Sequence, residues 1–188
     1  QSNRPLILVT NDDGIEAGGL RFLVETLLPI GDIVVVAPDR PMSGMGHAVT
    51  INQTLRMEKR QFSVEGVREA WQTSGTPVDC VKLAIYEILG KKPDLLVSGI
   101  NHGSNASINV IYSGTMSAAV EGAVEGIPSI GFSLLNHDPE ADFSACGPSI
   151  QTLAQEVLER GLPVGSCLNV NVPNIPLDAI QGIRICRQ

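Results

Sequence analysis

Two adjacent carboxylates follow a short apolar run near the start of the chain. Leu6 to Val9 are all apolar, and Asn11, Asp12 and Asp13 follow almost at once. A continuous apolar run of this kind is typical of a strand that is buried on both faces. Two carboxylates at its end repel each other and resist burial, and a hard cation such as Mg²⁺ or Mn²⁺ relieves both costs because it binds carboxylate oxygens. The same residue types also favour turns, so this stretch alone leaves a metal site and a simple turn open.

Two further loops carry oxygen-bearing side chains and also follow predicted strands. One runs from Pro38 to His47 and contains Ser43, and the other runs from Gly99 to Asn105 and contains Asn101. In an open α/β sheet the ligand site lies at the carboxyl ends of the strands, so we expect all three loops to meet there. Carboxylate, hydroxyl and amide oxygens suit Mg²⁺ or Mn²⁺ and suit zinc badly.

A helix that opens at Ser113-Gly114-Thr115 adds a possible anion site. Its first backbone N–H groups have no partner within the helix, and its dipole is positive at this end, so a phosphate would sit there. A metal ion beside such a helix end makes a phosphoryl site, because the metal polarises the phosphate and can activate a water molecule.

The elements that position these loops alternate between strands and helices. A strand at 6–9, a helix at 17–28 and a strand at 33–37 form a βαβ unit, which predicts a doubly wound, mostly parallel, Rossmann-like α/β sheet. Residues 48–73 predict a small β excursion beside that sheet, with short alternating pieces at 49–51, 55–57 and 62–64. Later strands are predicted at 94–98, 128–133, 167–172 and 183–186, and later helices at 77–89, 113–125 and 149–160. With no repeat and no long linker, we expect one domain over residues 1–188.

In two of the predicted helices the sequence also indicates the N-cap or the buried face. Thr76 is the expected N-cap of its helix, with Pro77 in the first position and Asp79 near the positive end. In the helix that ends at Glu125, we expect Glu121 and Glu125 on the solvent side, opposite an apolar face of five residues: Met116, Ala119, Val120, Ala123 and Val124.

Composition excludes several classes of partner. A formal net charge of −7 and a pI near 4.9 argue against a nucleic-acid groove or a membrane-surface patch, although a small anionic substrate is compatible with them. No apolar run approaches the roughly 20 residues of a membrane span, and no signal peptide is recognisable, so we expect a cytoplasmic protein. Cys80, Cys146, Cys167 and Cys186 form no Cys-x-x-Cys pair, and we expect reduced core thiols rather than disulfides or a zinc site.

Five motifs occur in an order that resembles the SurE survival-protein family. They are Val-Thr-Asn-Asp-Asp-Gly-Ile at 9–15, Val-Ala-Pro-Asp-Arg with Ser43 and Gly-His at 36–47, Gly-Thr-Pro-Val-Asp-Cys at 75–80, Val-Ser-Gly-Ile-Asn at 97–101 with Gly103 and Asn105, and Ser-Gly-Thr at 113–115. The resemblance runs from about Pro5 to the end of the chain. It implies a metal-dependent 5′/3′-nucleotidase that hydrolyses nucleoside monophosphates, and in some members short polyphosphate. It also implies a homodimer or homotetramer, and members usually continue past this end into a segment that exchanges between subunits.

The resemblance assigns roles residue by residue. Asp12 and Asp13 match the family's metal carboxylates, Ser43 its hydroxyl ligand and Asn101 its amide ligand, for one divalent cation per subunit. A metal-activated water would attack phosphorus, with Asp12 placed to orient or deprotonate it. His102 stands where other members carry Arg, so the resemblance does not say whether this chain makes the substrate contact of that Arg. Residues that match positions lining the phosphate pocket are Asn11, Gly44, Asn105, Ser113, Gly114 and Thr115.

Three alternatives fit less well. A haloacid-dehalogenase-type phosphatase requires Asp-x-Asp, whereas the two acids here are adjacent. A phospho-receiver signalling module, which also binds Mg²⁺, requires an Asp after its third strand and a Lys after its fifth, but the strands here end at Ser98 and Ser133. A dinucleotide-binding Rossmann domain requires Gly-x-Gly-x-x-Gly after its first strand. His47 and His102 could act as acid or base, but we expect structural roles because a metal can supply the activated water.

Overall fold

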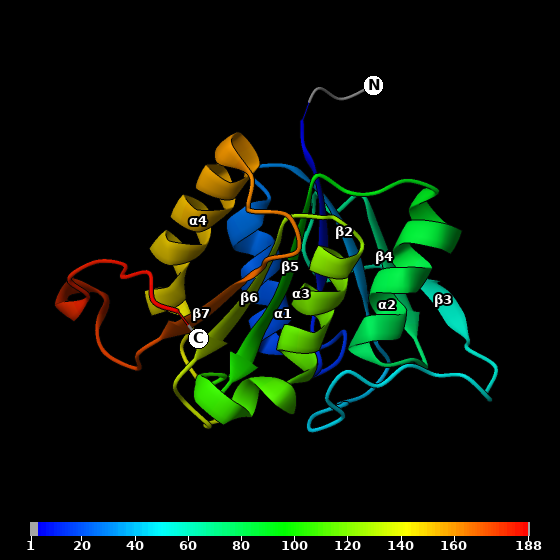
Figure 1. Ribbon diagram of the computed structural model, residues 1–188, viewed down its shortest axis with the longest axis horizontal. Helices are drawn as coiled ribbons and strands as arrows, with labels where there is room; N and C mark the ends of the chain where they lie inside the picture. The colour runs from blue at the N-terminus through cyan, green and yellow to red at the C-terminus, as the bar shows by residue number, and fades with distance from the viewer. Residues whose placement is uncertain (1–3, 188) are drawn as a thin grey trace.

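A seven-stranded sheet forms the centre of the computed structural model, which describes residues 4–187 (Figure 1). The strand order is β3-β4-β2-β1-β5-β6-β7. All neighbouring strands are parallel except β3 and β4. The strand bounds are β1 Leu6–Thr10, β2 Asp32–Pro38, β3 Met57–Arg60, β4 Glu69–Thr73, β5 Leu95–His102, β6 Ser129–Leu134 and β7 Leu168–Val172. The predicted doubly wound α/β sheet is confirmed.

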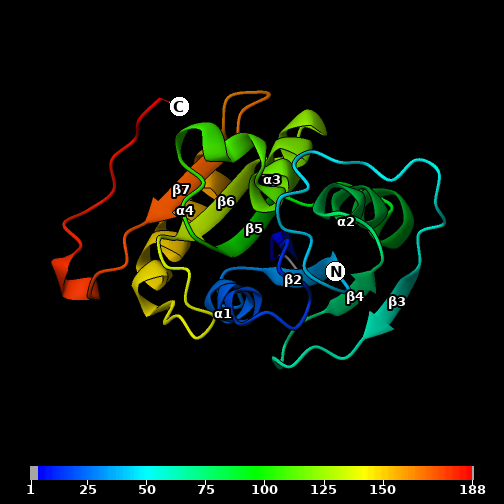
Figure 2. The same ribbon diagram turned by 90° about the horizontal axis from the view of Figure 1, so that it is seen from below.

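Helices cover both faces of this sheet (Figure 2). α1 (Gly18–Leu27) and α4 (Gly147–Arg160) pack on one face, where the larger apolar cluster includes Ile7, Val9 and Phe132. α2 (Pro77–Leu83) and α3 (Gly114–Val124) pack on the other face, over Leu8 and Val34. Alternate residues of β1 and β2 therefore point into different cores, which explains why residues 6–9 and 33–37 are apolar without interruption. Short helical segments complete the structure: η1 (Ala84–Leu89), η2 (Ser107–Ile111), η3 (Ser144–Cys146) and η4 (Leu177–Ala179).

The start of α2 follows the predicted cap. The Thr76 hydroxyl accepts a hydrogen bond from the backbone N–H of Asp79 at 3.2 Å, and the Asp79 carboxylate accepts one from the N–H of Thr76 at 2.9 Å. This reciprocal capping box, with Pro77 in the first turn, satisfies two N–H groups that the helix itself leaves free. Gly90, in the left-handed conformation, ends η1 as predicted.

The predicted β excursion is wrong in detail. Residues 49–51 and 62–64 form no strand, and of residues 55–57 only Met57 lies in one. The sheet instead takes Glu69–Thr73 as β4, parallel to β2 and within the main sheet, with β3 as an antiparallel edge. Local alternation predicted the pieces at 49–64, but a strand also needs a neighbour in register, and β2 offers that edge only to β4.

Two other predictions are wrong. Residues 183–186 form no strand, and Ile183 and Ile185 are exposed beyond β7. The expected faces of α3 also differ, because Glu121 is buried whereas Val120 and Val124 are exposed. α3 packs against both the sheet and α2, so its buried surface is wider than one stripe. Small residues allow this close packing, as at Gly122, where a Cβ would lie 2.2 Å from the Ser129 hydroxyl.

The four cysteines are free thiols, as predicted, but only two are core residues. Cys80 and Cys146 are buried, Cys167 is half-buried and Cys186 is exposed. Burial raises the pKa of the Cys80 thiol to about 12, so this group is unreactive at neutral pH.

Among residues 4–187, no helix combines the length and the apolar character that crossing a membrane requires.

Candidate active site

Asp12 is the second residue after β1 and is almost completely buried, with 2% of its surface exposed. Its Oδ1 accepts a hydrogen bond from the Thr115 hydroxyl, in the first turn of α3, at 2.6 Å. Burial raises the pKa of Asp12, while the Thr115 hydroxyl and backbone groups of Asp12, Thr115 and Gly114 lower it. The start of α3 therefore offsets part of the rise in the pKa of Asp12 that burial causes.

Asp13 lies beside Asp12 but is only half-buried. Burial raises the pKa of Asp13 to about 6, the charge of Asp12 adds to this rise, and the charge of His102 opposes it. The two carboxylates and the His102 ring thus lie close enough to act on one another. Such a pair favours a divalent cation, which would replace the repulsion between the carboxylates by attraction to both.

Asn11 shapes the turn that presents both acids. Its Nδ2 donates to the carbonyl of Gly14 at 2.9 Å, which closes the turn. Its Oδ1 is buried and has no hydrogen-bond partner within the described residues. A buried amide oxygen without a partner is costly, and a ligand that donates a hydrogen bond or carries positive charge would satisfy it.

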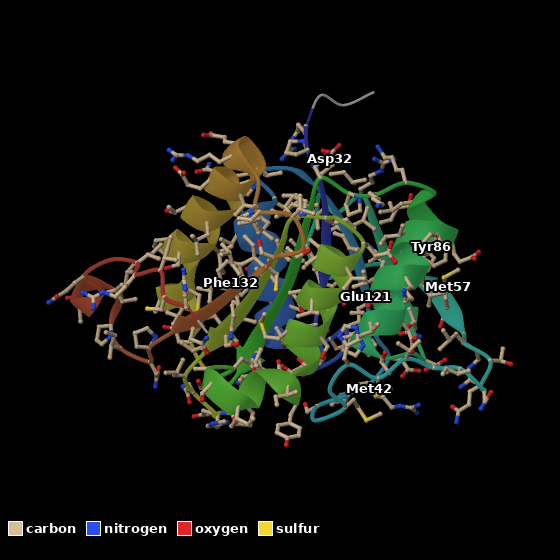
Figure 3. The ribbon with its side chains drawn as sticks, viewed as in Figure 1. Asp32, Met42, Met57, Tyr86, Glu121 and Phe132 are labelled. Atoms are coloured by element: carbon tan, nitrogen blue, oxygen red, sulfur yellow. The ribbon has the colours of Figure 1, made fainter. Side chains whose placement is uncertain are left out.

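The loop after β2 reaches the same place. The backbone N–H of Met42 donates to the carbonyl of Asp12 at 2.7 Å. Ser43 and Gly44 follow in an exposed turn, with Gly44 at a φ of +76°. Figure 3 shows Met42 in this loop below the carboxyl edge of the sheet. The contact places the predicted hydroxyl ligand one residue from a backbone hydrogen bond to Asp12.

The end of β5 brings the third loop to this edge. Thr10 and Ser98 are register partners in β1 and β5, and Asn101 follows three residues later. The Asn101 Nδ2 donates to the carbonyls of His102 at 3.1 Å and Gly103 at 2.9 Å. Both donor hydrogens of the amide are engaged, so its oxygen is the group that remains for a cation.

The start of α3 closes the site. Ser113 is the N-cap, and its Oγ accepts from the N–H of Met116 at 3.0 Å. Gly114 lies against Asp12: a Cβ at this position would lie 2.6 Å from the Asp12 Cβ and 2.9 Å from its Oδ2. Only glycine allows the helix end to approach the carboxylate so closely.

The structure thus brings together the turn after β1, the loop after β2, the end of β5 and the predicted start of α3. The prediction of a loop from residue 99 is wrong, because residues 99–102 extend β5. The family model described as Survival protein SurE matches residues 7–188. The chain belongs to the SurE family. It is 58% identical over 185 residues to the 5′-nucleotidase SurE of Christiangramia forsetii, covering 98% of this chain and 71% of that one. It is 60% identical to the 5′-nucleotidase SurE of Flavobacterium psychrophilum, covering 99% and 72%.

A solved structure agrees with this membership. The crystal structure of the SurE protein from Aquifex aeolicus superposes with a TM-score of 0.87 at 42% identity, over 98% of this chain and 72% of that chain. Because the superposition covers almost the whole chain, the fold that carries the candidate site is the SurE fold.

Two asparagines of this SurE chain that sequence reasoning missed hold the third loop in place. On β7, the Asn171 Oδ1 accepts from the N–H of Asn105 at 2.8 Å, and the Asn169 Nδ2 donates to the carbonyl of Asn105 at 2.8 Å. Asn105 itself is buried, with its Nδ2 donating to the Ser133 hydroxyl at 2.7 Å. The signal was the spacing of the two amides, since residues two apart in a strand point to the same face.

The donors present fit a hard cation better than a soft one. Among residues 4–187, no cluster of three or more His, Cys, Asp or Glu could hold a metal ion. The four residues that the resemblance assigns as ligands carry two carboxylates, a hydroxyl and an amide oxygen instead, and oxygen donors of these kinds suit Mg²⁺ or Mn²⁺. The buried, unpartnered oxygen of Asn11 is consistent with a ligand at this place.

Proposed function

We propose that this chain is a metal-dependent phosphomonoesterase that hydrolyses nucleoside 5′- and 3′-monophosphates to nucleoside and phosphate. Its relatives named 5′-nucleotidase SurE, at 58% and 60% identity, support the activity. The observation that carries the proposal is the pair Asp12 and Asp13, two adjacent carboxylates whose pKa values burial raises, at the carboxyl edge of the sheet. Two such groups are costly in a structural turn and useful in a metal site.

Four residues would hold one Mg²⁺ or Mn²⁺ ion: Asp12, Asp13, Ser43 and Asn101. When bound, the ion would polarise the phosphate and lower the pKa of a coordinated water. Asp12 would orient or deprotonate the attacking water. Its carboxylate is held in place for this role, because the Thr115 hydroxyl donates to its Oδ1 at 2.6 Å.

The phosphate would bind between the loop turn and the start of α3. Candidate contacts are Gly44, Asn105, Ser113, Gly114 and Thr115. The helix end already stabilises Asp12, so a phosphate there would share its positive potential with that carboxylate. Asn11 offers a buried amide oxygen, which suits a hydrogen-bond donor better than an ionised phosphate oxygen.

The phospho-receiver alternative is not favoured, because the SurE relatives match along almost the whole chain. Action on short polyphosphate, a homodimer or homotetramer, and a cytoplasmic location remain predictions.

Phosphate release from a panel of 5′- and 3′-nucleoside monophosphates tests the proposal. The assay is run with Mg²⁺, with Mn²⁺ and with EDTA, on the wild type, Asp13→Ala and the control Asp178→Ala, which changes an exposed acid in η4. We expect release that depends on metal, is abolished by Asp13→Ala and is unchanged by Asp178→Ala. Release that persists in EDTA, or in Asp13→Ala, would refute the metal assignment.

A further inference from the structure

The loop that carries Ser43 has no regular structure. Residues 39–56 connect β2 to β3, and within them Ser43, Gly44 and Met45 are exposed. A metal ligand has to be held within a fraction of an ångström of its place, so contacts elsewhere in the loop must supply that precision.

The first half of the loop is anchored at the sheet. The N–H of Asp39 donates to the carbonyl of Thr73 at 2.7 Å, and the N–H of Met42 donates to that of Asp12 at 2.7 Å. These bonds fix the chain up to Met42, immediately before Ser43.

The second half is anchored on α3 and on the residue before its N-cap. The N–H of Gly46 donates to the carbonyl of Tyr112 at 3.2 Å, and the His47 Nε2 lies 2.8 Å from the Glu121 Oε2. Glu121 is 4% exposed, and its other oxygen lies 2.5 Å from the Lys82 Nζ of α2. Figure 3 shows Glu121 on α3 at the side that faces α2. The buried acid thus joins both helices to the loop.

The capping box of α2 provides the next anchors. The Thr76 hydroxyl, which caps the helix, also donates to the carbonyl of Ala48 at 2.7 Å. The Asp79 carboxylate accepts from the Thr50 N–H at 3.1 Å and from the Thr50 hydroxyl at 2.6 Å. Asp79 is buried, with 2% of its surface exposed. A cap alone would not need these contacts, because Thr76 and Asp79 already satisfy each other.

We propose that residues 46–50 form a docking segment through which α2 and α3 position Ser43 for the metal ion. His47, Thr50, Asp79 and Glu121 are positioning residues in this scheme, and none of them touches the metal or the substrate. The Gly-Thr-Pro-Val-Asp-Cys motif at 75–80 then has a second purpose beyond capping, since its Thr76 and Asp79 hold the ligand loop. The inference rests on the proposed function, because it takes Ser43 as a metal ligand.

Two substitutions remove anchors without leaving a buried charge unpaired. Thr50→Val removes one hydrogen bond to Asp79, which keeps the bond from the Thr76 N–H at 2.9 Å. His47→Ala removes one partner of Glu121, which keeps Lys82. Thr50→Ser retains the hydroxyl. Thr26→Val is the matched control, since the Thr26 hydroxyl bonds to the Phe22 carbonyl within α1, on the opposite face of the sheet.

The measurement is the Mn²⁺ dissociation constant from calorimetric titration, together with the Tm of the metal-free protein. We expect Thr50→Val and His47→Ala each to weaken Mn²⁺ binding about three- to tenfold, the range that one lost hydrogen bond corresponds to. Thr50→Ser and Thr26→Val should stay within about twofold of the wild type. In a Ser43→Ala background the effect of Thr50→Val should disappear, because the ligand that it positions is gone.

The possible failures are distinguishable. Mn²⁺ binding that is lost in Asp13→Ala but unchanged in Thr50→Val and His47→Ala would overturn the docking segment alone. A lower Tm without a change in Mn²⁺ affinity, or the same loss with and without Ser43, would also overturn it. No Mn²⁺ binding by the wild type would overturn the proposed function and this inference together.

Discussion

Asp12 and Asp13 are adjacent in sequence but differ in environment. Asp12 is buried and accepts a hydrogen bond from Thr115. Asp13 is half-buried, and the charge of Asp12 raises its pKa while that of His102 lowers it. Burial raises the pKa of both carboxyl groups. Without a cation, the ionised pair therefore lowers the stability of the folded protein, as is common for groups retained for chemistry.

Replacing Asp13 by Asn should stabilise the metal-free protein, and only above about pH 4. The pKa of Asp13 is raised to about 6, above its unfolded value of about 3.9, so ionisation costs folding free energy. The cost is absent below about pH 4, grows between about pH 4 and pH 6, and is complete above it. After a discount for partial exposure we expect a gain of about 1–2 kcal/mol at neutral pH.

Urea unfolding in EDTA at about pH 4 and pH 8 measures this gain. The exposed Asp178→Asn is the control and should change little at either pH. An Asp13→Asn protein with the same stability as the wild type at pH 8 would contradict the assigned environment of this carboxyl group.

At the residue scale, the sequence was sufficient for side chains that follow strands and insufficient for pairs that depend on helix packing. Asp12 and Asp13 follow β1, and Asn101 lies near the end of β5, and neighbouring parallel strands bring their carboxyl ends to the same edge of the sheet. Glu121 and His47 are 74 residues apart, and their contact depends on how α3 packs against α2 and the loop. Periodicity placed Glu121 in solvent, because a helix covered on two sides has no single buried stripe.

At the element scale, the first turn of α3 lies so close to the turn after β1 that an added methyl group would not fit between them. The Gly114 position lies against Asp12, and a Cβ there would lie 2.6 Å from the Asp12 Cβ. Gly114→Ala should therefore displace either the helix end or the carboxylate. We expect a loss of about 1–3 kcal/mol of stability and a roughly tenfold or larger fall in metal-dependent turnover, the equivalent of about 1.4 kcal/mol.

Gly18→Ala is the matched control, since Gly18 begins α1 and a Cβ there would meet no neighbouring group within 4 Å. Its stability and turnover should stay at the wild-type level or rise slightly, because Ala favours the helix. Thermal unfolding and initial rates measure both effects. A Gly114→Ala protein with wild-type values would show that the helix end can yield without cost to the site.

A strand was predictable where burial on both faces left an apolar run in its sequence, and not where its place depended on a neighbouring strand. Residues 6–9 of β1 and 33–37 of β2 are apolar at every position because helices cover both of their faces, and β5 and β6 are rich in buried apolar residues, so the sequence marks these strands clearly. β4 has the mixed sequence Glu-Ala-Trp-Gln-Thr and pairs with β2 on one side and β3 on the other. Its place depends on an open sheet edge rather than on its own residues, so local patterns between 48 and 73 predicted the wrong segments.

At the scale of the whole molecule, the candidate metal ligands exist as a site only in the folded chain. Asp12 and Asp13 follow β1, Ser43 lies beyond β2 and Asn101 lies near the end of β5, so about 90 residues separate the first ligand from the last. An unfolded chain cannot bring four such oxygens together. Metal binding should therefore act on the unfolding of the entire domain, and not on the site alone.

Mn²⁺ should raise the Tm of the wild type in a concentration-dependent way. At 100 times the dissociation constant the stabilisation is about 2.7 kcal/mol, which for a chain of this length corresponds to a shift of roughly 5–10 °C. Asp13→Ala should show almost no shift, and Asp178→Ala should show the full one. If Asp13 binds the ion as proposed and destabilises the metal-free protein, the wild type should be less stable than Asp13→Ala in EDTA and more stable at saturating Mn²⁺. If the Tm of Asp13→Ala stayed above that of the wild type at every Mn²⁺ concentration, the assignment of Asp13 as a metal ligand would be contradicted, whatever the activity of either protein.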